Sequence, residues 1–521
     1  MVNWTALPEA QTLEINQATT VDVNGTDIAL CRDQHRYYAL ANRCPHRQGQ
    51  IGDGRVENGR IVCPLHAWDF DLTTGISPYD PADCLATYPV RLQNGVVEID
   101  ADTVPPTPTS GYLTQYQGRW RRFTDDIEEH YQTLHGFARY GRGAVESMRT
   151  TRPVPNFDAI QFRPAQLARL PLLDDEPVSL HVTLGRNSTR PLSLAMPLLV
   201  SHMSFGAISR EAKIALAHAT TAAGIAVCTG EGGMHPEERE HASRCILEMA
   251  SGYFGWTEDT IQQADAVEIK IGQAAKAGAG GLLPGPKVTP EIAAVRGIEP
   301  GQTAHSPARF PDINSPQDLA RRVTEIRAIN NGRPVGIKIA ASKLEEDLEA
   351  ALLSEPDWIT IDGRPGATGA APVHLKDHVG IPTIYAVDRA RRFFQTHRVR
   401  DVDLIVTGGL RTPADFAKAI AMGADAVAIA SSALIAIGCQ QYRACHTGNC
   451  PVGIATQQQA LRDRFDIDQA TATAKRFFGV VHDQLEDYCR ILGKPDIAAL
   501  SLEDLVTTDS EISTHTSVEH A

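Results

Sequence analysis

The sequence lacks the features that mark membrane, secreted and nucleic-acid-binding proteins. No apolar run reaches the roughly 18 residues that a membrane-spanning helix needs. The first residues contain neither a basic stretch nor an apolar core, so we expect no signal peptide. The formal net charge of −14 disfavours nucleic acid and anionic membranes as partners, because both carry charge of the same sign. These absences predict a cytoplasmic protein.

A nicotinamide-binding fingerprint is also missing. A redox reaction in this chain would therefore have to exchange electrons with another protein. At 521 residues the chain is too long for one ordinary domain, and we expect two or three. Ten cysteines, several of them spaced as metal ligands, indicate a reducing compartment rather than a disulfide framework.

The first group of spaced cysteines lies near the N-terminus. Cys44-Pro-His46 is followed, sixteen residues later, by Cys63-Pro-Leu-His66. Two thiolates and two imidazoles are the ligands of a Rieske [2Fe–2S] centre, in which two histidines replace two cysteines on one iron. Zinc is the alternative, because it binds the same ligand types at similar spacings. Residues 1–104 resemble Rieske ferredoxin-like domains around both ligand loops, and this resemblance favours the iron–sulfur cluster.

Short β-rich runs surround these ligand loops and predict a small antiparallel barrel. They are Thr19–Val23, Ile28–Leu30, Tyr37–Leu40 and Val96–Ile99. The Pro-rich stretch that begins at Val104 marks the end of this all-β domain. We expect residues 105–190 to form a linker and a helical connector.

From about residue 192 the sequence alternates between strand-like and helix-like segments. Eight strand–helix units predict an α/β fold, a (β/α)8 TIM barrel over residues 191–480, followed by a C-terminal helix and tail at 481–521. A doubly wound sheet is the alternative, but the glycine-rich turn expected after its first strand is absent. We also expect Gly272–Pro311 to cover the barrel mouth, and Thr507–Ala521 to be disordered. The eight predicted strands are Leu194–Val200, Ile225–Thr229, Ala266–Ile271, Val335–Ile339, Trp358–Ile361, Thr383–Val387, Asp403–Thr407 and Ala426–Ala430.

Glycine-rich segments follow the predicted strands, where TIM barrels place their active sites. The loops after strands seven and eight commonly bind a phosphate through backbone N–H groups, and Arg411 would add charge there. Lys338 lies inside the fourth run and would point into the mouth, where it would stabilise negative charge on a reduced flavin. Plain strand–helix turns are the alternative for any one glycine cluster. The candidate cofactor-binding residues are Ser204, Gly206, Lys338, Gly366, Gly369, Gly408, Gly409, Arg411 and Ser431.

The second group of cysteines places three thiols within twelve residues, with no fourth cysteine close by. They are Cys439, Cys445 and Cys450. Residues from about 150 to 507 are similar to the FMN-binding synthase domain of glutamate synthases. The resemblance implies FMN in the barrel and a [3Fe–4S] cluster on the three thiolates, because one corner of that cluster is empty. The motifs that carry it include Met203–Ser209, Thr229–Gly233, Gly408–Thr412 and Cys439–Gln457.

The resemblance also implies a reaction at a C–N bond. In glutamate synthases, FMN reduces an imine, formed from 2-oxoglutarate and ammonia, to glutamate. By position, Lys276 and Arg296 would clamp the substrate carboxylates, and Glu231 would be a polar group near the flavin. The chain departs from the family at Leu282, where glutamate synthases have a glutamine that contacts the substrate. The identities of the 2-oxo acid and of the amine therefore stay open.

A Rieske domain stands where glutamate synthases carry a glutaminase domain, so we expect ammonia to come from another source. Relatives that make or oxidise N-methylglutamate keep a different amine open. A non-catalytic electron-transfer flavoprotein subunit is a further alternative. We expect electrons to pass between a partner protein (a ferredoxin or a reductase), the Rieske cluster, the [3Fe–4S] cluster and FMN. The sequence leaves open the direction of flow and whether the chain forms a homo-oligomer.

Overall fold

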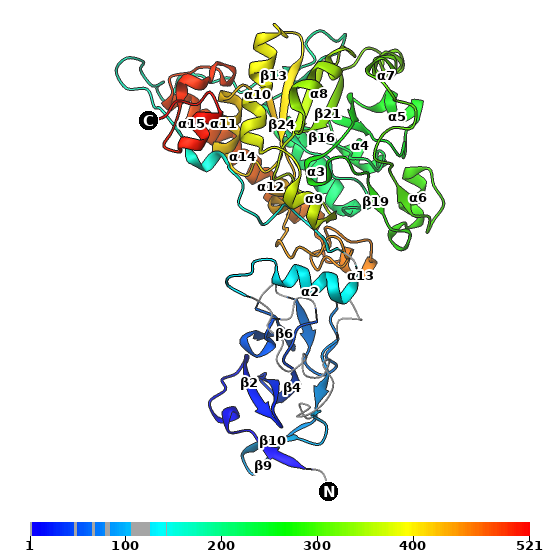
Figure 1. Ribbon diagram of the computed structural model, residues 1–521, viewed down its shortest axis with the longest axis vertical. Helices are drawn as coiled ribbons and strands as arrows, with labels where there is room; N and C mark the ends of the chain where they lie inside the picture. Colours follow the sequence, from blue (N-terminus) through cyan, green and yellow to red (C-terminus); the bar gives the residue numbers. More distant parts are fainter. Residues whose placement is uncertain (1–2, 46–48, 65–67, 79–83, 106–124, 142) are drawn as a thin grey trace. The chain divides into compact units, whose positions relative to one another are not determined.

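The computed structural model describes residues 3–45, 49–64, 68–78, 84–105, 125–141 and 143–521. The chain divides into two compact units, Met1–Ala144 and Val145–Ala521. Figure 1 shows the first unit as strands and the helix α2 (Tyr131–Tyr140), and the second as a strand core surrounded by helices. In the described part of the chain, no helix combines the length and apolar character that a bilayer crossing needs.

The N-terminal unit is an antiparallel β structure. Seven strands pair in the order β7-β6-β5-β2-β3-β4-β8, and three more pair in the order β1-β10-β9. All four predicted strands are confirmed within it. Apolar residues that alternate along the strands, such as Val21 and Val23 of β2, are buried in its core. The strands are β1 (Trp4–Ala6), β2 (Gln17–Val23), β3 (Thr26–Arg32), β4 (Tyr37–Ala41), β5 (Arg55–Glu57), β6 (Arg60–Val62), β7 (Asp69–Asp71), β8 (Thr87–Tyr88), β9 (Val90–Gln93) and β10 (Val96–Asp100).

Three Asn-Gly pairs make the tight hairpins of this unit. Asn24-Gly25 joins β2 to β3, Asn58-Gly59 joins β5 to β6, and Asn94-Gly95 joins β9 to β10. All six residues have positive φ. A two-residue hairpin turn that matches the twist of its strands requires this conformation, and Asn-Gly adopts it most readily. The turns therefore fix the register of three strand pairs.

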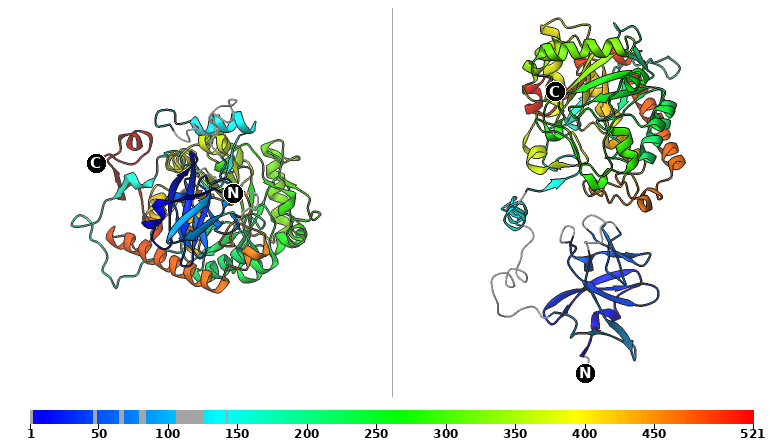
Figure 2. Two further views of the ribbon diagram at one scale, coloured as in Figure 1. Left: turned by 90° about the horizontal axis from the view of Figure 1, so that it is seen from below. Right: turned by 90° about the vertical axis from the view of Figure 1, so that its right-hand side faces the viewer.

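The second unit contains a closed barrel of eight parallel strands, in which β25 pairs with β15 to complete the ring. This confirms the predicted TIM barrel. The strands are β15 (Leu198–Val200), β16 (Ala226–Cys228), β17 (Cys245–Met249), β18 (Ala266–Lys270), β21 (Val335–Ala340), β22 (Trp358–Asp362), β24 (Asp403–Thr407) and β25 (Ala426–Ile429). The helices around them include α3 (Arg210–Ala223), α4 (Pro236–His241), α5 (Glu258–Gln263), α7 (Pro316–Ile329), α8 (Leu344–Leu352), α10 (Thr383–Thr396), α11 (Pro413–Ala421) and α12 (Ser431–Ala436) (Figures 1 and 2).

One predicted barrel strand is wrong and one was missed. Thr383–Val387 is the start of helix α10, which buries Ile384, Val387 and Phe394 at helical spacing. The run was predicted as a strand because its β-branched and aromatic residues are typical of strands. The third strand is instead β17, which the sequence analysis did not single out. Lys338 therefore lies in the fifth barrel strand rather than the fourth, while the seventh and eighth strands keep their predicted places.

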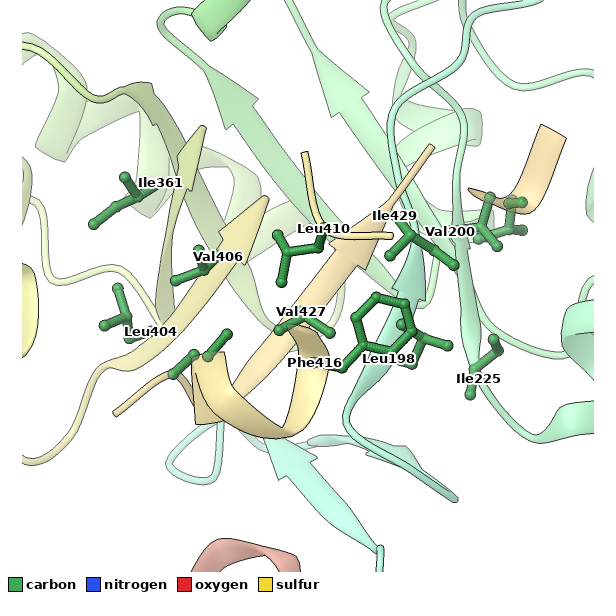
Figure 3. Close-up of a cluster of buried hydrophobic side chains, with 14 of the residues drawn as sticks. Leu198, Val200, Ile225, Ile361, Leu404, Val406, Leu410, Phe416, Val427 and Ile429 are labelled. Atoms are coloured by element: carbon green, nitrogen blue, oxygen red, sulfur yellow. The ribbon is translucent and has the colours of Figure 1, made fainter. Parts of the chain in front are cut away.

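Alternate residues of the barrel strands face opposite ways. Outward-facing Leu198 and Val427 pack under the ring of Phe416 from α11, as Figure 3 shows. Inward-facing Leu199 and Ile405 belong to a separate cluster at the N-terminal ends of the strands. The hairpin of β13 (Val182–Leu184) and β14 (Leu192–Leu194) contributes its leucines to that cluster. The lower half of the barrel interior is thus apolar and filled.

The C-terminal residues are ordered, contrary to the prediction for 507–521. Strand β26 (Leu505–Thr507) pairs with β12 (Ile160–Phe162), and α15 (Ser510–His515) follows it. Val518 is buried, and the Ser517 N–H donates to the Asp388 carboxylate at 2.7 Å. The polar composition of this tail concealed these anchoring contacts.

Candidate functional site

The upper half of the barrel interior is charged. Inward-facing positions low in the barrel are apolar or glycine, and ionisable side chains follow them two or four residues later on the same strands. Because side chains alternate along a strand, these groups point into the same central space at the C-terminal ends. They are Glu248 of β17, Glu268 and Lys270 of β18, Lys338 of β21 and Asp362 of β22.

Glu231, from the loop after β16, joins this layer through Lys270. The Lys270 ammonium lies 2.7 Å from the Glu231 carboxylate and 2.8 Å from that of Glu248. Burial alone would raise the pKa of Glu231, but the charges of Lys270 and Lys276 lower it to about 2. Burial also opposes the charged form of Lys270, yet its two carboxylates raise its pKa above the usual value. Glu231 and Lys270 are therefore both charged at neutral pH.

The structure brings together the three predicted catalytic residues. Lys276 lies in a 3-10 turn and Arg296 ends α6 (Pro290–Arg296), both within the segment 272–311. Burial lowers the pKa of Lys276 and of Arg296, and the charge of Glu231 opposes that shift in both. The Arg296 guanidinium donates to the Phe205 carbonyl at 2.9 Å, and its Nε has no hydrogen-bond partner among the described residues.

The segment 272–311 packs against the loops that follow β15 and β16, as expected of a cover over the mouth. Leu283, within it, clusters with Phe205. Gly281 approaches Glu231 so closely that a Cβ atom there would lie 2.1 Å from the carboxylate. Next to it, Leu282 leaves 58% of its surface exposed. This exposed apolar residue directly follows the glycine that approaches Glu231.

The glycines after β24 and β22 leave open backbone at the mouth. Gly408 and Gly409 have φ of 111° and 83°, and no described residue accepts a hydrogen bond from either N–H. Ser432, at the start of α12, reaches this loop by donating to the Arg411 carbonyl at 2.9 Å. The unpaired N–H groups of this loop suit the phosphate of FMN. Gly366 is needed because a Cβ there would meet the Asp362 carboxylate.

The other predicted cofactor-binding residues lie at the same end of the barrel. Ser204 and Gly206 form the turn after β15, and Gly369 lies beside Ala207 of that turn. Ser431 is the first residue of α12. Arg411 is already paired with Asp415 at 3.1 Å and with Asp158 at 2.9 Å, so its charge is largely offset. Its role toward a phosphate, like those of the other glycines and serines, stays a prediction.

The three C-terminal cysteines form one group of thiols. All three are free, and burial together with the neighbouring thiols raises the pKa of Cys445 to about 12. Three thiols facing one another, with no disulfide between them, suit a cluster that takes three cysteine ligands. Ser147 and His446 lie beside them, with the hydroxyl 2.8 Å from Nδ1.

In the N-terminal unit, Cys44 and Cys63 are both buried at loop positions. Their N–H groups donate to Gly49 at 2.9 Å and to Trp68 at 2.7 Å, which closes each loop. His46 and His66 lie outside the described residues, so their places as ligands stay predictions.

The sequence analysis missed His202, Glu248, Glu268 and Lys270. Glu268 offered a signal, because an acidic residue inside a strand predicted to be buried calls for a partner or a function. The sequence around His202 gave no such signal, because the contacts of this histidine are with residues far away in the sequence.

Comparisons with known proteins agree with this architecture. Residues 151–495 match the conserved region in glutamate synthase, and residues 3–89 match the Rieske [2Fe–2S] domain. A glutamate synthase large subunit-like protein of Rhizobium meliloti (strain 1021) is 34% identical over 70% of this chain and 86% of its own length. The archaeal glutamate synthase (NADPH) of Methanocaldococcus jannaschii is 40% identical over 59% of this chain and 61% of its own.

Among solved structures, an active chimera of (S)-mandelate dehydrogenase aligns with 67% of this chain and 88% of its own, at 14% identity and a TM-score of 0.45. Each of these is a protein that this chain resembles in part. The two family matches together span most of the sequence, and they agree with the barrel, the antiparallel unit and the thiol group. The chain is therefore an oxidoreductase of the glutamate synthase family, with FMN and a [3Fe–4S] cluster in its barrel unit and a Rieske [2Fe–2S] cluster in its N-terminal unit.

Proposed function

We propose that this protein reduces the imine of a 2-oxo dicarboxylic acid, such as 2-oxoglutarate, and ammonia or a small amine. The observation that carries the proposal is the pair Lys276 and Arg296. Both are cations at the barrel mouth, and neither has a carboxylate within 4 Å in the described part of the chain, because Glu231 and Glu248 are paired with Lys270. Cations held at one mouth without a carboxylate partner favour an anionic ligand, and two of them suit two carboxylates.

Glu231 has a separate role in this proposal. At neutral pH it is a carboxylate, so it accepts hydrogen bonds and supplies no proton. It would therefore orient an amine or stabilise the positive charge of an iminium group. FMN, when bound, supplies the hydride and takes up electrons one at a time. The glycine loops after β22 and β24, with the start of α12, would hold it.

Electrons would enter from another protein through the Rieske cluster and pass by the [3Fe–4S] cluster. A relative of Antithamnion sp., 35% identical over 64% of this chain and 23% of its own, is named a ferredoxin-dependent glutamate synthase. A ferredoxin is therefore one candidate donor, and a reductase is the other. A subunit that only transfers electrons would have no use for two uncompensated cations at the mouth.

A second candidate is an amine larger than ammonia. Leu282 is exposed and directly follows Gly281, the residue that approaches Glu231, so an alkyl group on the nitrogen would have an exposed apolar side chain available in the same segment. An enzyme that forms or oxidises an N-alkyl amino acid fits this arrangement.

The experiment is an anaerobic reoxidation assay. Reduced protein is mixed with 2-oxoglutarate and either ammonia or methylamine, and flavin absorbance is followed. We expect rapid reoxidation with the dicarboxylate and slow reoxidation with 2-oxobutyrate, which lacks the second carboxylate. If no pair of oxo acid and amine reoxidises the flavin, the aminating function is wrong. Reduction of oxidised flavin by an amino acid would show the reverse direction.

A further inference from the structure

His202, just after β15, lies between two residues of the charged layer. Its Nδ1 is 2.8 Å from the ammonium of Lys338, and its Nε2 contacts Oε1 of Glu268. The Glu248 carboxylate is further away, at 3.7 Å from Nε2, and the Ser201 hydroxyl lies 3.1 Å from Nδ1. Only 9% of the imidazole is exposed. A histidine this enclosed has its proton position set by its partners.

Glu268 is a fixed anion. Its other oxygen, Oε2, accepts hydrogen bonds from Trp358 Nε1 at 2.8 Å and from Thr360 Oγ1 at 2.5 Å. Burial raises the pKa of Glu268, but His202, Lys338 and Thr360 lower it to about 2. Trp358 reaches Glu268 only because residue 336 is glycine, since a Cβ there would lie 2.0 Å from the indole nitrogen.

These partners define the tautomer of His202. An ionised carboxylate only accepts hydrogen bonds, so Nε2 carries the proton that faces Glu268. An ammonium group only donates, so Nδ1 is the bare acceptor that faces Lys338. Nε2 thus faces the carboxylate, and Nδ1 faces the ammonium.

A metal ion is a poor alternative occupant. Potential ligand atoms of His202, Cys228 and Glu248 do lie within 4.8 Å of one another. Two of these residues, however, already contact an ammonium group at 2.8 Å: His202 contacts Lys338, and Glu248 contacts Lys270. The two positive charges would repel a cation at this point.

Lys338 has a competing partner. The Asp362 carboxylate lies 3.7 Å from its Nζ, close enough to become a direct ion pair after a small movement. We propose that His202 is a positioning residue: its imidazole, oriented by Glu268, holds the ammonium of Lys338 toward the flavin and away from Asp362. The inference rests on the proposed place of Lys338 beside FMN. A positive charge held there stabilises the reduced, anionic flavin and raises its reduction potential.

The test is an anaerobic redox titration of the flavin in the full-length holoprotein, with no substrate present. His202→Leu removes the acceptor, and we expect the two-electron equilibrium to shift about tenfold toward oxidised flavin, or roughly 30 mV. His202→Asn keeps an oxygen where Nδ1 stands, so its potential should stay close to that of the parent. Flavin content and the electron paramagnetic resonance signals of the clusters control for folding.

Glu268→Gln tests the same positioning of Lys338 without a substitution at His202. Trp358 and Thr360 hold the oxygen of Gln at the Oε2 position, so its NH2 would face His202 Nε2 and force the proton to Nδ1. Lys338 would lose its acceptor, and we expect the potential to fall as it does in His202→Leu. This variant keeps the test decisive if His202→Leu fails to fold.

An unchanged potential in the folded variants, His202→Leu or Glu268→Gln, would overturn the inference. An equal fall in His202→Asn and His202→Leu would also overturn it, because the acceptor would then be irrelevant. Failure of imine reduction alone leaves these potentials intact and affects only the proposed function. A parent protein that bound no FMN would overturn both.

Discussion

The ammonium of Lys287 donates a hydrogen bond to the main-chain carbonyl of His446 at 2.7 Å. Lys287 belongs to the segment that carries Lys276 and Arg296, whereas His446 directly follows Cys445, a predicted ligand of the [3Fe–4S] cluster. The segment that covers the barrel mouth is thus tied to the loop of the [3Fe–4S] cluster. A positive charge also lies close to that cluster.

Lys287→Met should lower the reduction potential of the [3Fe–4S] cluster, because a nearby positive charge favours the reduced state. We expect a fall of roughly 60 mV, equal to a tenfold change for a one-electron couple. Titration followed by electron paramagnetic resonance measures it. Lys287→Arg, which keeps the charge, should retain most of the potential, and an equal fall in both variants would contradict an electrostatic role.

Arg296→Met should weaken binding of a 2-oxo dicarboxylate by about 10- to 100-fold, because a charge-assisted hydrogen bond contributes roughly 1.5–3 kcal/mol. The KM for 2-oxoglutarate should rise while kcat changes less. Arg296→Lys should recover part of the loss. If KM stayed unchanged in Arg296→Met, the carboxylates would bind elsewhere.

As the pH is raised, substrate binding should weaken at a lower pH than it would if Lys276 had the pKa of an ordinary lysine. Burial lowers the pKa of Lys276, so its ammonium form is present below that lowered pKa and is lost as the pH rises through it. The KM for 2-oxoglutarate, measured from pH 7 to 10, should rise accordingly. In Lys276→Arg the rise should move to higher pH, and an identical profile would exclude Lys276 as the titrating group.

Gly336→Ala should destabilise the barrel by about 1–3 kcal/mol, the usual effect of overpacking a filled core. The new methyl group would collide with Trp358 and break its bond to Glu268. Thermal unfolding measures the change. Gly479→Ala is the matched control: Gly479 lies inside α14 (Ile467–Ile491) with open space around it, so alanine should stabilise by about 0.5–1 kcal/mol.

Local patterns in the sequence predicted most of the architecture and part of the site. Strand periodicity identified seven of the barrel strands, and the cysteine spacing identified the thiol group. Strand prediction from the sequence failed at two segments, because their residue types are atypical of the structure they form. Glu248 interrupts the apolar run of β17, and the β-branched start of α10 imitates a strand.

The charged layer lay beyond local reasoning for a different reason. His202, Glu268 and Lys338 come from elements separated by more than sixty residues, and only closure of the barrel brings them together. Their protonation depends on mutual contacts that no spacing in the chain reveals. Lys276 and Arg296 were named by family resemblance, while their lack of carboxylate partners became visible in three dimensions.

The pairing of β12 with β26 has a consequence for how the second unit comes apart. It joins a strand near the start of that unit to one near its end, with more than three hundred residues between them in the sequence. Fraying at either end would have to break the same three-residue ladder and the Thr507 hydroxyl bond to Ala159, at 2.6 Å. Amide protons of β12 and β26 should therefore exchange with solvent at the same rate, because both strands open in one cooperative step. Removing residues after Asp504 would leave the unit open at both ends at once.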